Sequence, residues 1–294
     1  MGTANILCNR AGARCVQTRF FLGADREAAV LTRRFRGAHM RIAILGDLHL
    51  IAPDDPDHER RVRRRHFADT GPAWAALTRS LRDQRPDLLL CAGDLVDWCS
   101  PANVAYARAQ MDALGIPWLM TPGNHDLEGP GTDHAAVWQA QGLMLGNRLI
   151  DCDGLGIVLL DSHDSGLPAD TGFWLDAQAT PGDRPLILVT HVPWNSVAMQ
   201  AWIEQRQPGR DLKKYVQSRV PLIYDQHLRG RFHSAFFGHL HCDGLSHEDG
   251  TCCHMLSLAL HAAYKDYPGQ GRYAMLDSTT LTARIVSHPR PDDQ

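Results

Sequence analysis

The sequence predicts an α/β layered fold, and two observations lead to that prediction. Short apolar or β-branched runs recur along the chain, and stretches with apolar residues at helical spacing lie between several of them. The apolar runs are continuous rather than alternating with polar residues, which is typical of strands in a sheet covered on both faces. We therefore expect strands and helices to alternate, with ligand sites in the loops at the strand ends.

Six expected strands run directly into polar residues, and they cover residues 41–47, 87–94, 116–125, 155–162, 185–191 and 234–239. Two helices are expected between them. Residues 72–81 place Trp74, Leu77 and Leu81 at helical spacing, and residues 103–114 form the second helix. Near the C-terminus the pattern changes to strands with little helix between them, which we expect to finish a second sheet: residues 252–258, 271–277 and 280–286.

Composition limits the classes of partner that the protein can have. The chain has 294 residues, 44% of them hydrophobic, which is enough for a sizeable core. Its net charge of −3 gives no overall attraction to nucleic acid or to an anionic membrane, so neither stable nucleic-acid binding nor membrane association is expected. No apolar run approaches the roughly 20 residues of a membrane helix. The eight cysteines include no C-x-x-C pair, which favours reduced thiols and a cytoplasmic location.

Residues 1–39 differ in composition from the rest of the chain. They carry seven arginines and only two acidic residues, which is a feature of mitochondrial-type transit peptides. The interpretation that we prefer is an N-terminal extension that is disordered or lies outside the core. Residues 40–294 contain no linker-like stretch and no internal repeat, so we expect them to form one domain.

Polar residues with metal-binding or proton-transfer side chains gather at the ends of the predicted strands. They come from the strings GDLH, GD, GNHD, THVPW and GHLH, and are Asp47, His49, Asp94, Asn124, His125, His191, His239 and His241. Oxygen and imidazole donors without a thiolate suit manganese, iron, zinc or nickel ions. Because the residues are too many for one four-coordinate ion, the sequence predicts two ions that share a bridging carboxylate.

The order of these strings, D-x-H, GD, GNHD, H and GHxH, resembles the calcineurin-like metallophosphoesterase superfamily over residues 41–241, with no motif missing. In size and motif order the chain is similar to the bacterial class III cyclic-nucleotide phosphodiesterases of that superfamily. The resemblance implies a four-layer α/β/β/α sandwich of two mixed β-sheets flanked by helices, with a dinuclear metal site at the strand ends. Residues 40–294 would then be the metallophosphoesterase domain.

The resemblance also implies which residues hold each of the two divalent or trivalent metal ions. Asp94 would bridge the two ions. One ion would be held by Asp47, His49 and His241. The other would be held by Asn124, His191 and His239.

Two of the motif residues would lie outside the ligand set. The resemblance implies that His125 contacts the phosphate or protonates the leaving oxygen, and that Asp126 orients its ring. The spacing of the last two histidines has a separate consequence. We expect the two side chains of the H-x-H string, in an extended segment, to point in different directions, so that His239 and His241 could serve different ions.

Two further residues are candidates for substrate binding, beside Asn124 and His125. His163 follows a predicted strand whose end should also face the site. Trp194 comes three residues after His191 and could either stack on a flat group or pack in the core.

The string HERRVRRRHF at residues 58–67 holds five arginines within six residues and could clamp a phosphate or a nucleic acid. Acidic residues lie just before it and within it. We therefore expect these charges to neutralise one another on a solvated loop or helix start.

Together these features predict a two-metal-dependent phosphoesterase that hydrolyses a phosphodiester by metal-activated hydroxide, with a cyclic nucleotide as one candidate substrate. A phosphomonoesterase, a nuclease or a pyrophosphatase could use nearly the same site, so these stay as alternatives. A non-catalytic scaffold of the same fold is less favoured, because such a protein should lack some of the ligands. The expected partner is a small phosphoester, and the sequence leaves the oligomeric state open.

Overall fold

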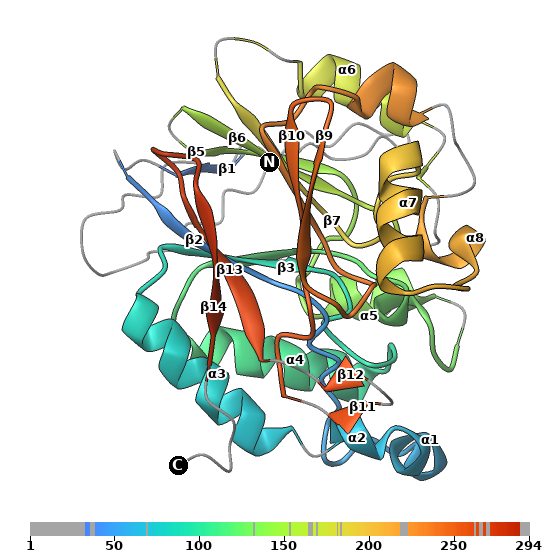
Figure 1. Ribbon diagram of the computed structural model, residues 1–294. Helices are drawn as coiled ribbons and strands as arrows, with labels where there is room; N and C mark the ends of the chain where they lie inside the picture. Colours follow the sequence, from blue (N-terminus) through green and yellow to red (C-terminus); the bar gives the residue numbers. More distant parts are fainter. Residues whose placement is uncertain are drawn as a thin grey trace.

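The computed structural model shows two mixed β-sheets that pack face to face and carry helices on their outer sides (Figure 1). This arrangement confirms the predicted four-layer sandwich. The structure describes residues 33–35, 39–68, 70–131, 133–152, 154–163, 167–168, 170–180, 182, 184–217, 223–261, 263–264, 267–268 and 271–288.

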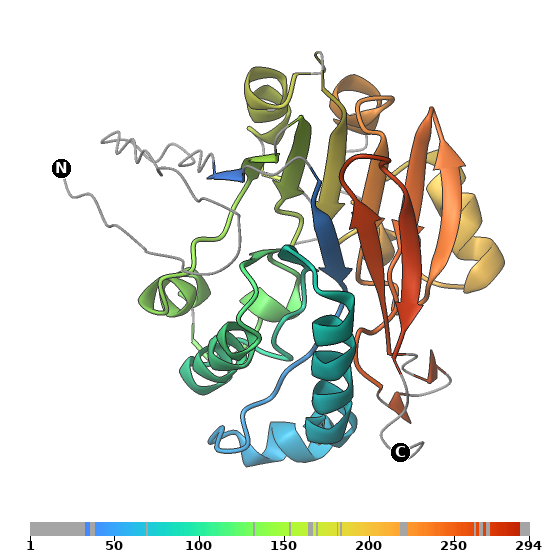
Figure 2. The ribbon, with the colours of Figure 1, turned by 90° about the vertical axis from the view of Figure 1, so that its left-hand side faces the viewer.

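The smaller sheet has five strands in the order β14-β13-β2-β3-β4. Its strands are β2 (Arg41–Leu45), β3 (Leu88–Ala92), β4 (Trp118–Thr121), β13 (Arg272–Asp277) and β14 (Ala283–Ser287). The first three run parallel, and β13 is antiparallel to both of its neighbours. Figure 2 shows the red strands β13 and β14, from the end of the chain, beside the blue β2. Three helices cover the outer face: α3 (Gly71–Gln84), α4 (Pro101–Ala113) and α5 (His134–Ala140).

The larger sheet has seven strands in the order β1-β5-β6-β7-β8-β10-β9. Its strands are β1 (Arg33–Phe35), β5 (Arg148–Cys152), β6 (Leu155–Leu160), β7 (Leu186–Thr190), β8 (Ser234–Phe237), β9 (Gly244–Glu248) and β10 (Thr251–Met255). Two helices and a π-helical turn cover its outer face: α6 (Thr171–Gln178), α7 (Val197–Arg206) and η2 (Tyr224–Leu228). The remaining elements are short: α1 (His58–Arg63), α2 (Arg65–Ala68), η1 (His125–Leu127), α8 (Leu212–Tyr215), β11 (Ala263–Tyr264) and β12 (Tyr267–Pro268).

Side-chain alternation along the strands explains why the apolar runs are continuous. In β2, Ile42 and Ile44 face the other sheet, whereas Ala43 and Leu45 face the helices. Strand β7 divides its residues between the inter-sheet core and the outer core in the same way. Since both faces of these strands are covered, an apolar residue is favoured at every position.

The six predicted strands all form, each shorter than expected, because the polar residues at their ends turn away into loops. The expectation for the C-terminal strands was wrong in part. Strand β10 joins the seven-stranded sheet, whereas β13 and β14 join the five-stranded one. Strands β5 and β9 were not predicted. Strand β9 is an edge strand in which Leu245 and His247 are exposed, so it lacks an apolar run.

One strand lies within the segment predicted to be an extension. Residues of β1 pair in parallel with β5, with Arg33 opposite Ile150, so the boundary at residue 40 separates this strand from its sheet. Most of residues 1–39 lie outside the described residues, and their role stays a prediction. In the described part of the chain, no helix has the length and apolar character needed to cross a bilayer.

Candidate metal centre

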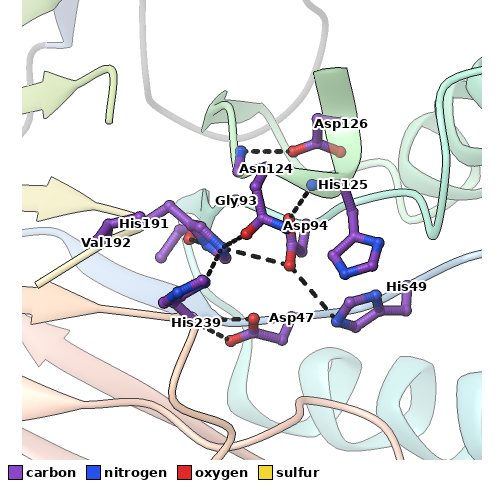
Figure 3. Close-up of polar contacts among 12 residues, drawn as sticks. Asp47, His49, Gly93, Asp94, Asn124, His125, Asp126, His191, Val192 and His239 are labelled. Carbon is purple, nitrogen blue, oxygen red and sulfur yellow. Dashed lines mark hydrogen bonds and ion pairs between the residues drawn. The ribbon is translucent and has the colours of Figure 1, made fainter. Parts of the chain in front are cut away.

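The predicted metal ligands all lie in loops that leave the carboxyl ends of five strands. Asp47 and His49 follow β2, Asp94 follows β3, and His191 follows β7 directly. Asn124 follows β4, and the two histidines of GHLH follow β8. Figure 3 shows that the labelled side chains among them turn toward one another from both sheets. Parallel strands end at the same edge of a sheet, so strands distant in sequence deliver these residues to one place.

One cluster consists of Asp47, His49, Asp94 and His241. One ligand atom from each lies within 4.8 Å of the others. Nε2 of His241 is 3.2 Å from Nε2 of His49 and 3.3 Å from Oδ1 of Asp47. Three of these side chains are the set predicted for one ion, and the fourth, Asp94, is the predicted bridging carboxylate.

A second cluster surrounds Nε2 of His191. That atom lies 3.2 Å from Oδ1 of Asn124, 3.2 Å from Nδ1 of His239 and 3.3 Å from Oδ2 of Asp94. The structure therefore also brings together the residues predicted for the other ion. Asp94 belongs to both clusters, because the same Oδ2 is 3.6 Å from Nε2 of His49.

The hydrogen bonds of the imidazole rings leave their lone pairs facing inward. Nδ1–H of His191 donates to the carbonyl of Ala92 at 2.9 Å, and Nε2–H of His239 donates to the carbonyl of Lys214 at 2.8 Å. When both rings are neutral, the two remaining ring nitrogens carry lone pairs and face each other at 3.2 Å. Two such acceptors need a proton or a metal ion between them. The donor set therefore fits metal ions, which neutral imidazoles and carboxylates bind.

The electrostatics of the clusters favour the binding of a cation. Burial lowers the pKa of His49 to about 4, and burial together with the nearby His191 lowers that of His239 to about 4. Burial would also lower the pKa of His191, but the carboxylate of Asp94 raises it to about 9. Burial works against ionisation of Asp94 as well, yet His191 and His125 hold its pKa well below the usual range. Ionised carboxylates beside neutral imidazoles attract a cation, and a metal ion can take the place of the proton on His191.

The backbone is strained where it presents the ligands. Asp47, His49, Asp94, His239 and His241 have φ angles of 43°, 48°, 51°, 68° and 55°. This left-handed conformation costs a residue other than glycine roughly 1–2 kcal/mol, and such strain gathers at functional sites. The extended conformation predicted for the H-x-H string was wrong. Its two histidines reach different clusters because the chain turns at each of them.

Two glycines allow the loops to approach closely. A Cβ added to Gly93, whose φ is +88°, would lie 2.5 Å from Nδ1 of His191. A Cβ added to Gly123 would overlap the carboxylate of Asp94. Any larger residue at either position would displace a predicted ligand.

His125 lies beside the clusters, with a quarter of its side chain exposed. Its Nδ1–H donates to the carbonyl of Asp97 at 2.8 Å, which leaves Nε2 available. The prediction that Asp126 orients this ring was wrong. The carboxylate of Asp126 accepts the backbone N–H groups of Gly123 and Val96 at 2.8 and 3.0 Å, so it stabilises the loop instead.

Two residues at the site were missed by sequence reasoning, Asp97 and Arg64. Oδ1 of the buried Asp97 accepts Nδ1–H of His49 at 2.9 Å. Arg64 donates from Nε and Nη2 to the two oxygens of that carboxylate. Asp97 follows Asp94 by three residues at the same strand end, and this spacing could have revealed it. The arginine run was expected to be solvated, which is wrong for Arg64 because it reaches into the site.

The two further candidates for substrate binding, His163 and Trp194, have different outcomes. His163 lines a cavity of about 360 Å³ that adjoins the second cluster, together with Asn124, Leu127, Glu128, Asp133, His134 and Ala135. His163 therefore stays a candidate for substrate contact. The stacking role considered for Trp194 was wrong. Its indole is buried between Tyr224 and Phe237 and donates to Glu248 at 2.8 Å, so it belongs to the core.

Comparison with known proteins identifies a family model and relatives that this chain matches in sequence. Residues 40–243 match the family model described as calcineurin-like phosphoesterase. The chain is 25% identical over 268 residues to a 3′,5′-cyclic-nucleotide phosphodiesterase of Nostoc sp., across 84% of this chain and 92% of that protein.

Two other curated relatives match over shorter stretches. A probable cyclic nucleotide phosphodiesterase of Synechococcus sp. is 31% identical over 159 residues, across 52% of this chain. This match spans 58% of the Synechococcus protein, less than two thirds of its length. A glycerophosphodiester phosphodiesterase of Enterobacter lignolyticus is 30% identical over 122 residues, across 37% of this chain and 43% of that protein.

A solved structure resembles the fold of this chain. It is a dimetal phosphatase from Danio rerio, with a TM-score of 0.51 and 14% sequence identity. The superposition covers 85% of this chain and 99% of the other. At this level of identity, the likeness concerns the fold alone.

Proposed function

The chain belongs to the calcineurin-like phosphoesterase family, and on this premise we propose that it hydrolyses a small phosphodiester with the help of two metal ions. The observation that carries the proposal is the position of Oδ2 of Asp94. It lies 3.6 Å from Nε2 of His49 and 3.3 Å from Nε2 of His191, between two clusters of inward-facing ligand atoms. A carboxylate oxygen in this position can bridge the two ions of a dinuclear centre.

The donor set suits manganese, iron, zinc or nickel ions. Asp47, His49 and His241 would hold one ion, Asn124, His191 and His239 the other, and Asp94 both. Ions held there would supply positive charge against the phosphoryl oxygens and lower the pKa of water, so that hydroxide is available near neutral pH.

His125 is the residue proposed to protonate the leaving oxygen. The carbonyl of Asp97 holds its Nδ1–H, so the proton to be transferred would be at Nε2. Burial lowers the pKa of His125, but the carboxylates of Asp94 and Asp97 outweigh burial and raise the pKa above its ordinary value. A raised pKa favours the protonated ring, which is the form that a general acid needs.

Preference for a diester has two supports. The three relatives reported above carry the names of cyclic-nucleotide or glycerophosphodiester phosphodiesterases. The cavity between Asn124 and His163 also offers room for a second ester substituent beside the proposed ions.

A substrate panel tests this proposal. The protein would be incubated with Mn²⁺ and 3′,5′-cyclic AMP, glycerophosphocholine or AMP, and the products separated by chromatography. We expect hydrolysis of at least one of the two diesters, with little phosphate released from AMP. Rapid hydrolysis of AMP, with both diesters intact, would replace the proposal with a phosphomonoesterase.

A further inference from the structure

The segment that contains α1 and α2 packs over the first cluster. The ring of Phe67 stacks on the ring of His49, with centroids 4.4 Å apart and an interplanar angle of 11°. The guanidinium carbon of Arg64 lies 4.9 Å from the centre of the Phe67 ring. Phe67 therefore contacts the predicted ligand His49. Arg64, three residues earlier, contacts Asp97, which is hydrogen-bonded to His49.

Arg64 fixes the carboxylate of Asp97 with two hydrogen bonds. Nε donates to Oδ2 at 2.7 Å, and Nη2 donates to Oδ1 at 2.5 Å. A two-point contact of this kind restrains both the position and the plane of a carboxylate. Oδ1 is thereby directed at Nδ1 of His49, to which it is bonded at 2.9 Å.

Asp97 acts on two functional residues through different atoms. Its carboxylate accepts Nδ1–H of His49, which orients Nε2 of that ring toward Asp94 and His241. Its main-chain carbonyl accepts Nδ1–H of His125. A shift of Asp97 would therefore disturb a predicted metal ligand and the predicted general acid together.

We propose that Arg64 is a positioning residue of the metal centre, which aligns His49 for metal binding by fixing the carboxylate of Asp97. The neighbouring arginines differ from it: Arg63 and Arg65 are exposed, whereas Arg64 is about a fifth exposed and its partner Asp97 is fully buried. The inference rests on the proposed metal centre but not on the choice of substrate.

The direction in which metal affinity changes on removal of Arg64 distinguishes a positioning role from a purely electrostatic one. Removal of a positive charge close to the clusters would by itself favour the binding of a cation. Loss of alignment at His49 would instead weaken binding, since residues that orient metal ligands are typically worth about 10–100-fold in metal affinity. A fall in affinity on removal of Arg64 therefore reports its positioning role.

The test is a titration of metal-free protein with Mn²⁺, with the free ion followed by electron paramagnetic resonance. Three variants of the full chain are compared with the wild type: Arg64→Gln, Arg64→Lys and, as the matched control, Arg63→Gln. We expect Arg64→Gln to weaken one of the two sites by about 10–100-fold. Arg64→Lys should weaken the same site, because a lysine keeps the charge but loses the two-point contact. The control should bind both ions as the wild type does.

Unchanged Mn²⁺ affinity in both Arg64 variants would overturn the inference, even if their metal-free thermal stability falls, because the residue would then be purely structural. Arg64→Lys keeps the test decisive if the glutamine variant fails to fold. A wild-type protein that binds two ions but hydrolyses no phosphodiester would refute the proposed function alone.

Discussion

The main-chain N–H of His125 donates a 2.9 Å hydrogen bond to Oδ1 of Asp94. This bond occupies one carboxylate oxygen and leaves the other, Oδ2, between His49 and His191. The loop that carries the predicted general acid thus also sets which oxygen of Asp94 faces the clusters. One local contact therefore fixes the predicted proton donor relative to the predicted bridging ligand.

Replacement of Asp94 by alanine should abolish binding at both metal sites. The single Oδ2 serves both clusters, and no other carboxylate among the described residues takes part in both. Elemental analysis of the purified variant should find far less than one ion per chain. Asp54→Ala, at an exposed position, is the control and should keep two ions. Two ions retained by the Asp94 variant would show that this residue is not the bridge.

His125→Ala should keep both metal ions but lose activity in a way that depends on the leaving group. General acid catalysis contributes roughly 10²–10⁴-fold when the departing oxygen is basic, as in a nucleotide-type diester. The loss should be clearly smaller for p-nitrophenolate, which departs without a proton. Rate constants for the two substrates test this. An equal loss on both would assign His125 to phosphate positioning instead.

His163→Ala should raise KM for a diester substrate by about 2–10-fold and leave kcat nearly unchanged, as expected for the loss of one hydrogen bond to bound substrate. The residue lines the cavity next to Asn124 and lies outside both clusters. Steady-state kinetics and metal content are the measurements. His227→Ala, on the outer face of the larger sheet, is the control. An unchanged KM would exclude contact between His163 and the substrate.

His254 should make the protein sensitive to mild acid. Its ring is buried against Phe236, Nδ1 has no hydrogen-bond partner among the described residues, and burial lowers the pKa to about 4. An unfolded histidine titrates near 6.5. The unfolded state therefore takes up a proton that the folded state does not, and stability present above pH 6.5 is lost as the pH falls toward 4.

The loss attributable to His254 should approach about 3 kcal/mol. Urea unfolding of the metal-free wild type and of His254→Phe, from pH 7.5 to 4.5, measures it. The variant should gain stability relative to the wild type steadily below pH 6.5. A constant difference across that range would contradict the assigned pKa shift.

Most of the site could be predicted because its residues occur in short strings at the ends of apolar runs. Asp47, Asp94 and His191 each follow a buried strand, and parallel strands deliver such residues to one edge. The layered fold could also be predicted from these runs, since strands covered on both faces need continuous apolar sequence.

The contacts that support the ligands could not be predicted, because they depend on how separate segments pack. Arg64 and Asp97 are 33 residues apart and meet only because the chain folds back over the first cluster. The ring of His125 is held by a main-chain carbonyl. Every residue has such a carbonyl, so the amino-acid sequence does not reveal this contact. Trp194 follows a ligand in sequence, yet packing against Phe237 turns it into the core.

The most direct test of a two-metal phosphodiesterase is the turnover of bis-p-nitrophenyl phosphate and p-nitrophenyl phosphate by one preparation. Metal would first be removed with a chelator, and Mn²⁺ would then be added back in steps. The account predicts no turnover by the metal-free protein, recovery that saturates near two ions per chain, and faster hydrolysis of the diester than of the monoester. Diester turnover that persists in the metal-free protein, or a monoester that reacts faster at every Mn²⁺ level, would contradict it.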